Sequence, residues 1–122
     1  MDVSLDYSQI SKTGALISKI ATAASTNATS VKPGEGRVIG WTLTNTTAAF
    51  KYFRLFNLAT APTVGTNSPT YIVGIPPNST INRTDDGDSF GTGIAYAITG
   101  AVADLDATVT AANDVIGALY YV

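Results

Sequence analysis

The alternation of residues 37–45 constrains the fold of this chain more than any other feature. The segment places large apolar side chains at every second position and small or hydroxylated side chains between them. One set is Ile39, Trp41 and Leu43, and the other is Val38, Gly40, Thr42 and Thr44. A period of two is typical of a β-strand with one buried face. We expect the Trp41 set to be buried and the threonine set to be accessible.

Similar short runs recur along the rest of the chain, and Gly, Pro and Asn separate them as turn residues. Surface helices draw on Glu, Gln and Lys, yet this chain has one Glu, one Gln and four Lys, so strands are favoured. The other expected strands are residues 14–24, 29–32, 49–58, 71–75, 79–83, 93–99 and 114–122. The pattern predicts an all-β, antiparallel β-sandwich with seven or eight short strands. We describe it as jelly-roll-like, although an immunoglobulin-like strand order fits equally well.

The 122 residues are enough for one domain. Residues 1–12 are polar and form an expected extended N-terminal arm, and residues 13–122 form the expected sandwich domain. On the arm, Leu5, Tyr7 and Ile10 are spaced apolar residues that either fray or lie across a neighbour. The first residues carry no basic or apolar run typical of a signal peptide. No stretch reaches the roughly 18 apolar residues of a transmembrane helix, so we expect no membrane contact.

The composition argues against most catalytic and nucleic-acid-binding classes. The chain has no Cys and no His, which excludes thiol nucleophiles, Cys or His zinc sites and Ser-His-Asp triads. With seven Lys plus Arg and a net charge of −2, a phosphate-binding basic face is not expected. The sequence therefore predicts a protein that is not an enzyme, has no cofactor and no metal, and does not bind nucleic acid.

The expected strand 49–58 is apolar on both faces, which a strand with one solvated face would not be. Phe53 and Leu55 lie on one face. The other face carries Phe50, Tyr52, Arg54 and Phe56. Aromatic residues and Arg are enriched at protein interfaces, so we predict a subunit interface there. The alternative is that this face belongs to the domain's own core.

Two short acidic segments have a structural and a cation-binding interpretation. Asp85, Asp86, Gly87 and Asp88 form an expected tight turn, because Asp and Gly are ordinary turn residues and an EF-hand pattern is absent. The pair Asp104 and Asp106 has the same two interpretations. It can also hold its own loop through side-chain to main-chain hydrogen bonds.

Several segments from residue 33 onwards resemble a family of small proteins of tailed phages. They are RVIGWTLTNT (37–46), YFRLFN (52–57), APTVGT (61–66), IPPNST (75–80), GIAYAITG (93–100), AD (103–104) and DVI (114–116). The chain is similar to head decoration or cement proteins, in particular to cyanophage-like small virion structural proteins. The region that these segments span, in this order, covers about three quarters of the chain, and the segment 93–100 carries the resemblance most strongly.

The resemblance implies a non-enzymatic virion protein, made in the host cytoplasm, that sits on the outer capsid surface. It implies homotrimers that bind the major capsid protein and clamp neighbouring capsomers. On this hypothesis Phe50, Tyr52, Arg54 and Phe56 contribute to the subunit interface. Leu5, Tyr7 and Ile10 of the arm then contact the capsid.

Two other functions stay open. One is a tail-fibre, spike or baseplate domain that binds a host glycan or another tail protein. A glycan site needs exposed aromatic rings beside Asp or Asn, which Tyr71, Tyr96, Asp86 and Asp88 could supply. The other is a lectin-like adhesion domain outside phages.

Overall fold

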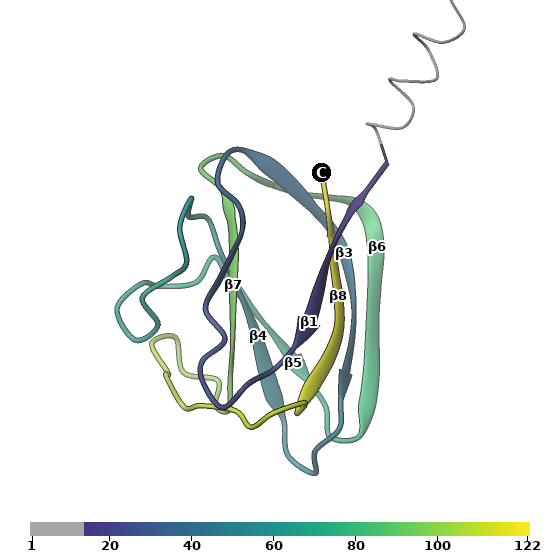
Figure 1. The fold of residues 1–122 in the computed structure, drawn as a ribbon, viewed down its shortest axis with the longest axis vertical. Coiled ribbons are helices and arrows are strands. Elements are labelled where there is room, and N and C mark those ends of the chain that lie inside the picture. The colour runs from purple at the N-terminus through teal and green to yellow at the C-terminus, as the bar shows by residue number, and fades with distance from the viewer. Residues whose placement is uncertain (1–13) are drawn as a thin grey trace, which may run out of the picture.

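The computed structural model describes residues 14–122, which form eight strands in two packed sheets (Figure 1). The strands are β1 (Leu16–Ala21), β2 (Thr29–Lys32), β3 (Gly36–Asn45), β4 (Lys51–Phe56), β5 (Tyr71–Ile75), β6 (Ser79–Phe90), β7 (Ile94–Thr99) and β8 (Val115–Tyr121). Each of them falls on a run that the sequence predicts as a strand, so the all-β fold class is confirmed. The expected arm, residues 1–12, lies outside the described residues.

The order of the strands is that of a jelly roll. Sheet A has the order β1-β8-β3-β6, and sheet B has the order β2-β7-β4-β5. All neighbouring strands are antiparallel. An immunoglobulin-like sandwich pairs its first strand with its second, whereas β1 here pairs with β8. Two four-stranded sheets in this order therefore correspond to the double Greek key of a jelly roll.

A single aromatic-rich core fills the space between the two sheets. The ring of Trp41 on β3 meets Phe53 on β4 edge-on, with 5.7 Å between ring centroids. Phe53 in turn packs 5.6 Å from Tyr96 on β7. Leu43 and Leu55 are fully buried beside them. The predicted burial of Trp41 and Leu43 is confirmed, and the face of β4 that carries Phe53 and Leu55 is buried as well.

The alternation of β3 breaks near its start. Val38 is fully buried and Ile39 is only partly buried, the reverse of the expected arrangement. Val38 pairs with Tyr121 and Gly40 pairs with Tyr120, so Ile39 is an extra residue on β3 relative to β8. A one-residue bulge shifts the side-chain alternation, and periodicity within β3 gives no sign of it.

The acidic segment 85–88 is part of β6, so its assignment as a tight turn is wrong. Val38 pairs with Asp88 and Gly40 pairs with Thr84, so residues 85–87 form a bulge opposite Ile39. Gly87 has a φ of 90°, a conformation that glycine adopts without strain. Asp and Gly favour bulges for the same backbone reasons that they favour turns. The strand consequently continues to Phe90.

Two long loops cover much of the outward face of sheet B. In Figure 1 the loops after β4 and after β7 lie on the side of sheet B that faces away from sheet A. Leu58 and Val64 of the first loop pack on Phe56, and main-chain groups of the second loop contact Arg54. Sheet B is therefore sandwiched between the core and a layer of loops.

Candidate functional site

The outward face of β4, predicted as a subunit interface, is divided by the covering loops. Arg54 and Phe56 are each only 1% exposed, because the chain's own loops lie over them. These two side chains are therefore internal contacts, contrary to the hypothesis that they face a partner. Phe50 is 47% exposed and Tyr52 is partly exposed, so this half of the predicted surface remains accessible.

Arg54 fastens the loop between β7 and β8 to sheet B. Its Nε donates a hydrogen bond to Oγ1 of Thr99 at 2.7 Å. Its terminal nitrogens donate to the main-chain oxygens of Ala101, Ala103 and Asp104 at 2.5, 2.8 and 2.9 Å. A planar guanidinium can bind several acceptors at once, which a lysine cannot do. One buried side chain thereby fixes three residues of an irregular loop.

Asp106 holds the same loop from within. Its carboxylate accepts hydrogen bonds from the main-chain nitrogens of Ala101 and Thr108 and from the Thr108 hydroxyl. Desolvation raises the pKa of Asp106, but these hydrogen bonds outweigh it and leave the pKa below its usual value. Burial lowers the pKa of Arg54, while the negative charges of Asp106 and Asp104 oppose that shift. The prediction that the acidic pair can hold its own loop through side-chain to main-chain hydrogen bonds is confirmed for Asp106.

The loop directs three apolar side chains into solvent. Val102, Leu105 and Val109 are 60%, 51% and 58% exposed. The carboxylate of Asp104, between the first two, is hydrogen-bonded to the hydroxyl of Ser68 in the other covering loop. Exposed apolar side chains on a loop that is tied down at several points are typical of a binding surface.

The two accessible aromatic residues border this loop. The rings of Phe50 and Tyr52 are stacked, 6.1 Å apart and 18° from parallel. Gly74 lies opposite Tyr52 on β5, and a Cβ there would touch both rings. Tyr52 pairs on its other side with Thr99, from which the β7–β8 loop departs. We call Phe50, Tyr52, Val102, Leu105 and Val109 together the sheet B surface.

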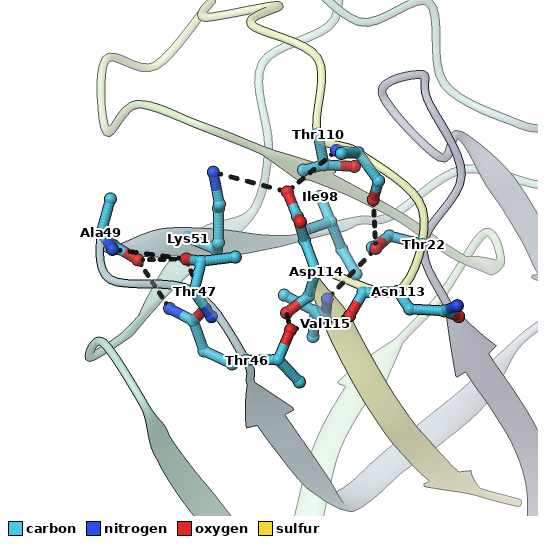
Figure 2. Close-up of polar contacts among 12 residues, drawn as sticks. Thr22, Thr46, Thr47, Ala49, Lys51, Ile98, Thr110, Asn113, Asp114 and Val115 are labelled. Carbon is cyan, nitrogen blue, oxygen red and sulfur yellow. Dashed lines mark hydrogen bonds and ion pairs between the residues drawn. The ribbon is translucent and has the colours of Figure 1, made fainter.

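The other end of the β7–β8 loop is fixed by a cluster of polar contacts (Figure 2). The hydroxyl of Thr22 donates to the oxygen of Ala111 and accepts from the main-chain nitrogen of Val115. Asp114 accepts from the main-chain nitrogen of Ala111 and forms an ion pair with Lys51 at 3.6 Å. These groups bring the loops that follow β1, β3 and β7 together, so the sheet B surface is supported from both ends of its loop.

Arg83 joins the two edge strands β6 and β5. It binds Asp85 through two nitrogens at 2.8 and 3.1 Å and binds Asp88 at 2.7 Å. The Tyr71 hydroxyl donates to the same Asp88 carboxylate at 2.9 Å. Arg83 lies 5.1 Å from the centre of the Trp41 ring, within cation–π distance. Hydrogen bonds from Arg83 lower the pKa of both carboxyls, while burial, and then the bond to Asp88, raises the pKa of Tyr71.

The described part of the chain offers few other sites. Within residues 14–122, no three acidic, histidine or cysteine side chains gather where they could hold a metal ion. The same residues include no helix long and apolar enough to cross a membrane. Two shallow depressions have volumes of about 330 and 430 Å³. Tyr96 is 5% exposed, so its ring is not available for a glycan to stack on. Tyr71 is partly exposed, and its hydroxyl is bound to Asp88.

Comparison with protein-family models, with curated proteins and with solved structures gives no match for this chain. The resemblance to phage decoration proteins therefore stays a prediction. The arm residues Leu5, Tyr7 and Ile10 lie outside the described residues, so their contact with a capsid also stays a prediction.

The apolar residues of the β7–β8 loop are the part of the site that reasoning from the sequence missed. The signal was Val102, Leu105 and Val109 within a segment of Ala, Thr and Asp that lacks strand alternation. A long ordered loop without secondary structure is often functional.

Proposed function

We propose that this chain is a non-enzymatic structural protein of a tailed-phage virion. It binds the outer capsid surface as a cement or decoration protein and bridges neighbouring major capsid proteins. The observation that carries the proposal is the rigid β7–β8 loop with three apolar side chains held outward. A surface of this kind suits contact with another protein better than it suits catalysis.

The supports beneath the loop favour tight binding. Arg54 and Asp106 fix the loop before any partner arrives, so little conformational entropy is lost on association. The carboxylate of Asp106 already accepts three hydrogen bonds within the loop, so contact with a partner does not leave it without hydrogen-bond partners. Val102, Leu105 and Val109 can then enter apolar pockets of a partner without disturbing the loop.

The stacked pair Phe50 and Tyr52 is the candidate contact between subunits of a homotrimer. A trimer with repeated contacts to a shell gains affinity from avidity, so each single contact can be modest. Changing both residues to Ser is expected to leave a folded monomer, because both rings are accessible. Light scattering after size exclusion measures the mass, and a trimer has three times the mass of the monomer. A Phe50→Ser, Tyr52→Ser variant that keeps the oligomeric state of the parent would exclude this contact.

Co-sedimentation with capsid shells tests the proposed function. The shells are assembled from the major capsid protein of the same phage genome and lack decoration proteins. The parent protein is expected to pellet with the shells, and a Leu105→Ser, Val109→Ser variant is expected to lose at least tenfold in affinity. Ile17→Ser is the matched control, because Ile17 is exposed on β1 in the opposite sheet. Failure of the parent to bind any shell would refute the proposal.

A tail-associated module is the alternative function. The same loop could bind a tail-fibre, spike or baseplate protein. Immunogold labelling of intact virions separates the two, because label on the tail alone would contradict the capsid location.

A further inference from the structure

The outward face of sheet A differs from that of sheet B, because its side chains stay accessible. Three rows of paired residues define the face, and each row crosses β1, β8, β3 and β6 in register. The half formed by β1 and β8 consists of Ile17, Lys19, Ala21, Ile116, Ala118 and Tyr120. Ile17 is 68% exposed and Ile116 is 39% exposed. We call these residues the apolar half.

The other half of the face is rich in hydroxyl groups. It consists of Gly40, Thr42, Thr44, Thr80, Asn82 and Thr84 on β3 and β6. The Thr42 hydroxyl donates to Asn82 at 2.8 Å, and the hydroxyls of Thr44 and Thr80 share a hydrogen bond at 2.7 Å. Four of the five polar side chains in this half, those of Thr42, Thr44, Thr80 and Asn82, therefore take part in a hydrogen bond within the sheet. We call these residues the hydroxyl half.

Burial of this face carries a low energetic cost for two reasons. Desolvation is costly for a polar group that loses its hydrogen-bond partners. Thr42 and Thr44 avoid this cost, because their side-chain hydrogen bonds to β6 persist when water leaves the face. Lys19 is the single charged residue among the twelve positions. Arg83 of β6 lies on the opposite, inward face of the sheet, over the Trp41 ring. Depletion of charge is the compositional mark of the centre of an interface.

We propose that the sheet A faces of two copies of this chain pair with each other about a two-fold axis parallel to the strands. Lys19 selects this axis. An axis perpendicular to the strands would place Lys19 against the Lys19 of the second copy, and like charges in contact disfavour association. The parallel axis places Lys19 over Asn82 instead. It also sets the apolar half of each copy against the hydroxyl half of the other.

Two features near the axis suit such a pair. The Tyr120 hydroxyl donates to Thr42 at 3.1 Å, so its ring lies across the middle of the face. Two Tyr120 rings then meet at the axis, where symmetry brings identical residues together. Ile116 is placed over Thr44 of the other copy, beside the depression of about 430 Å³ that Thr44 helps to line.

The size of the face predicts a weak dimer. With strands about 4.8 Å apart and residues about 3.4 Å apart, the twelve positions span about 400 Å² of each copy. A pair then buries about 800 Å², and interfaces below about 1,200 Å² are typical of weak or transient complexes. We expect pairing at hundreds of micromolar protein and none at a few micromolar, roughly the range of a weak complex. The inference does not rest on the proposed capsid function.

Sedimentation equilibrium over this concentration range tests the pairing. The mass of the species present at the lowest concentration is expected to double if that species is a monomer, and to at least double if it is a trimer, because a trimer presents three sheet A faces. Ile116→Glu places two like charges on either side of the axis and is expected to weaken association at least tenfold. Thr60→Glu adds the same charge at an exposed residue of the loop after β4, which lies on the side of sheet B away from sheet A (Figure 1), and serves as the matched control.

A charge-swap mixture tests the symmetry of the contact. Ile116→Glu and Ile116→Lys proteins are each expected to stay unpaired, and their mixture is expected to associate. Deletion of residues 1–12 is expected to leave the association constant unchanged. Absence of a mass increase in the parent, loss of that increase in Thr60→Glu in place of Ile116→Glu, or a changed association constant after the deletion would each overturn the proposal. Circular dichroism confirms that each variant is folded.

Discussion

Replacing Arg54 by Met tests whether one buried side chain holds the β7–β8 loop in place. The substitution keeps much of the aliphatic volume and removes four hydrogen bonds, one to Thr99 and three to main-chain oxygens. A hydrogen bond to a charged group contributes about 1.5–3 kcal/mol, so four bonds, each at the lower value, contribute about 6 kcal/mol before other effects are counted. Two effects reduce this value.

The first effect is that removing the guanidinium also removes the cost of burying it. The second is that Ala103 and Asp104 lie at the surface, so their freed oxygens can bind water. We therefore expect Arg54→Met to lower the free energy of unfolding by about 3 kcal/mol, or roughly 10 °C in melting temperature for a chain of this length. Arg54→Lys is expected to lose about half as much, because an ammonium cannot reach all of the acceptors.

Urea unfolding measures the loss of global stability, and hydrogen exchange measures the loss of local stability in the β7–β8 loop. The amides of Gly100 and Asp106 donate to Thr108 and Ala103 within the loop, so both should lose protection in Arg54→Met. Trp41 fluorescence reports on the core and should keep its folded value in the absence of urea. If Arg54→Met kept its stability within about 0.5 kcal/mol, the surface-mutation range, and its loop amides stayed protected, the reasoning would be refuted.

Three further predictions address the core, the ion pairs and a close backbone contact. Trp41→Ala should destabilise the protein by about 3–5 kcal/mol in guanidinium unfolding, and a loss below about 1 kcal/mol would contradict its place in the core. Asp88 has a pKa lowered mainly by Arg83, so its contribution to stability should be complete above the unfolded value of about 3.9 and should disappear as the pH falls through the folded pKa. Asp88→Asn should make the melting temperature less dependent on pH in this acidic range. A dependence on pH as steep as that of the parent would argue against the ion pair. Gly40→Ala should cost about 1–3 kcal/mol, because its Cβ would overlap the main-chain oxygen of Arg83, whereas Gly34→Ala meets no atom within 4 Å and should be close to neutral. Equal melting temperatures for these two variants would contradict the close approach.

The positions of the strands could be predicted because they depend on local patterns. Trp41 and Leu43 alternate with small or hydroxylated residues, and a period of two is visible within a few residues. The choice between a jelly roll and an immunoglobulin-like order depends on which strands pair. That information lies in contacts such as Leu16 with Tyr121, which no local pattern encodes.

The candidate site could be predicted only in part, because covering loops decide which strand residues stay accessible. Phe50, Tyr52, Arg54 and Phe56 share one face, and nothing in their spacing separates the two that are covered from the two that are not. Arg54 lies under the loop because the carbonyl groups of Ala101, Ala103 and Asp104 converge on it. Convergence of main-chain groups leaves no trace in residue types.

The acidic segment 85–88 shows a second limit. Asp and Gly tolerate backbone conformations that other residues avoid, and both turns and bulges use this tolerance. Only the pairing of Asp88 with Val38 and of Thr84 with Gly40 distinguishes a bulge within β6 from a turn at its end.

The central place of β8 in sheet A has a consequence for how the chain acquires its structure. This strand follows β1 and β3 in the sequence, yet it lies between them and supplies the neighbour that β1 pairs with. During synthesis, β1 and one edge of β3 therefore have no strand to pair with until residues 115–121 have left the ribosome. Contacts between such distant segments slow folding, and unpaired strand edges favour association between nascent chains. Translation speed through the final strand, and chaperones that shield open edges, should therefore affect the yield of this protein more than its equilibrium stability does.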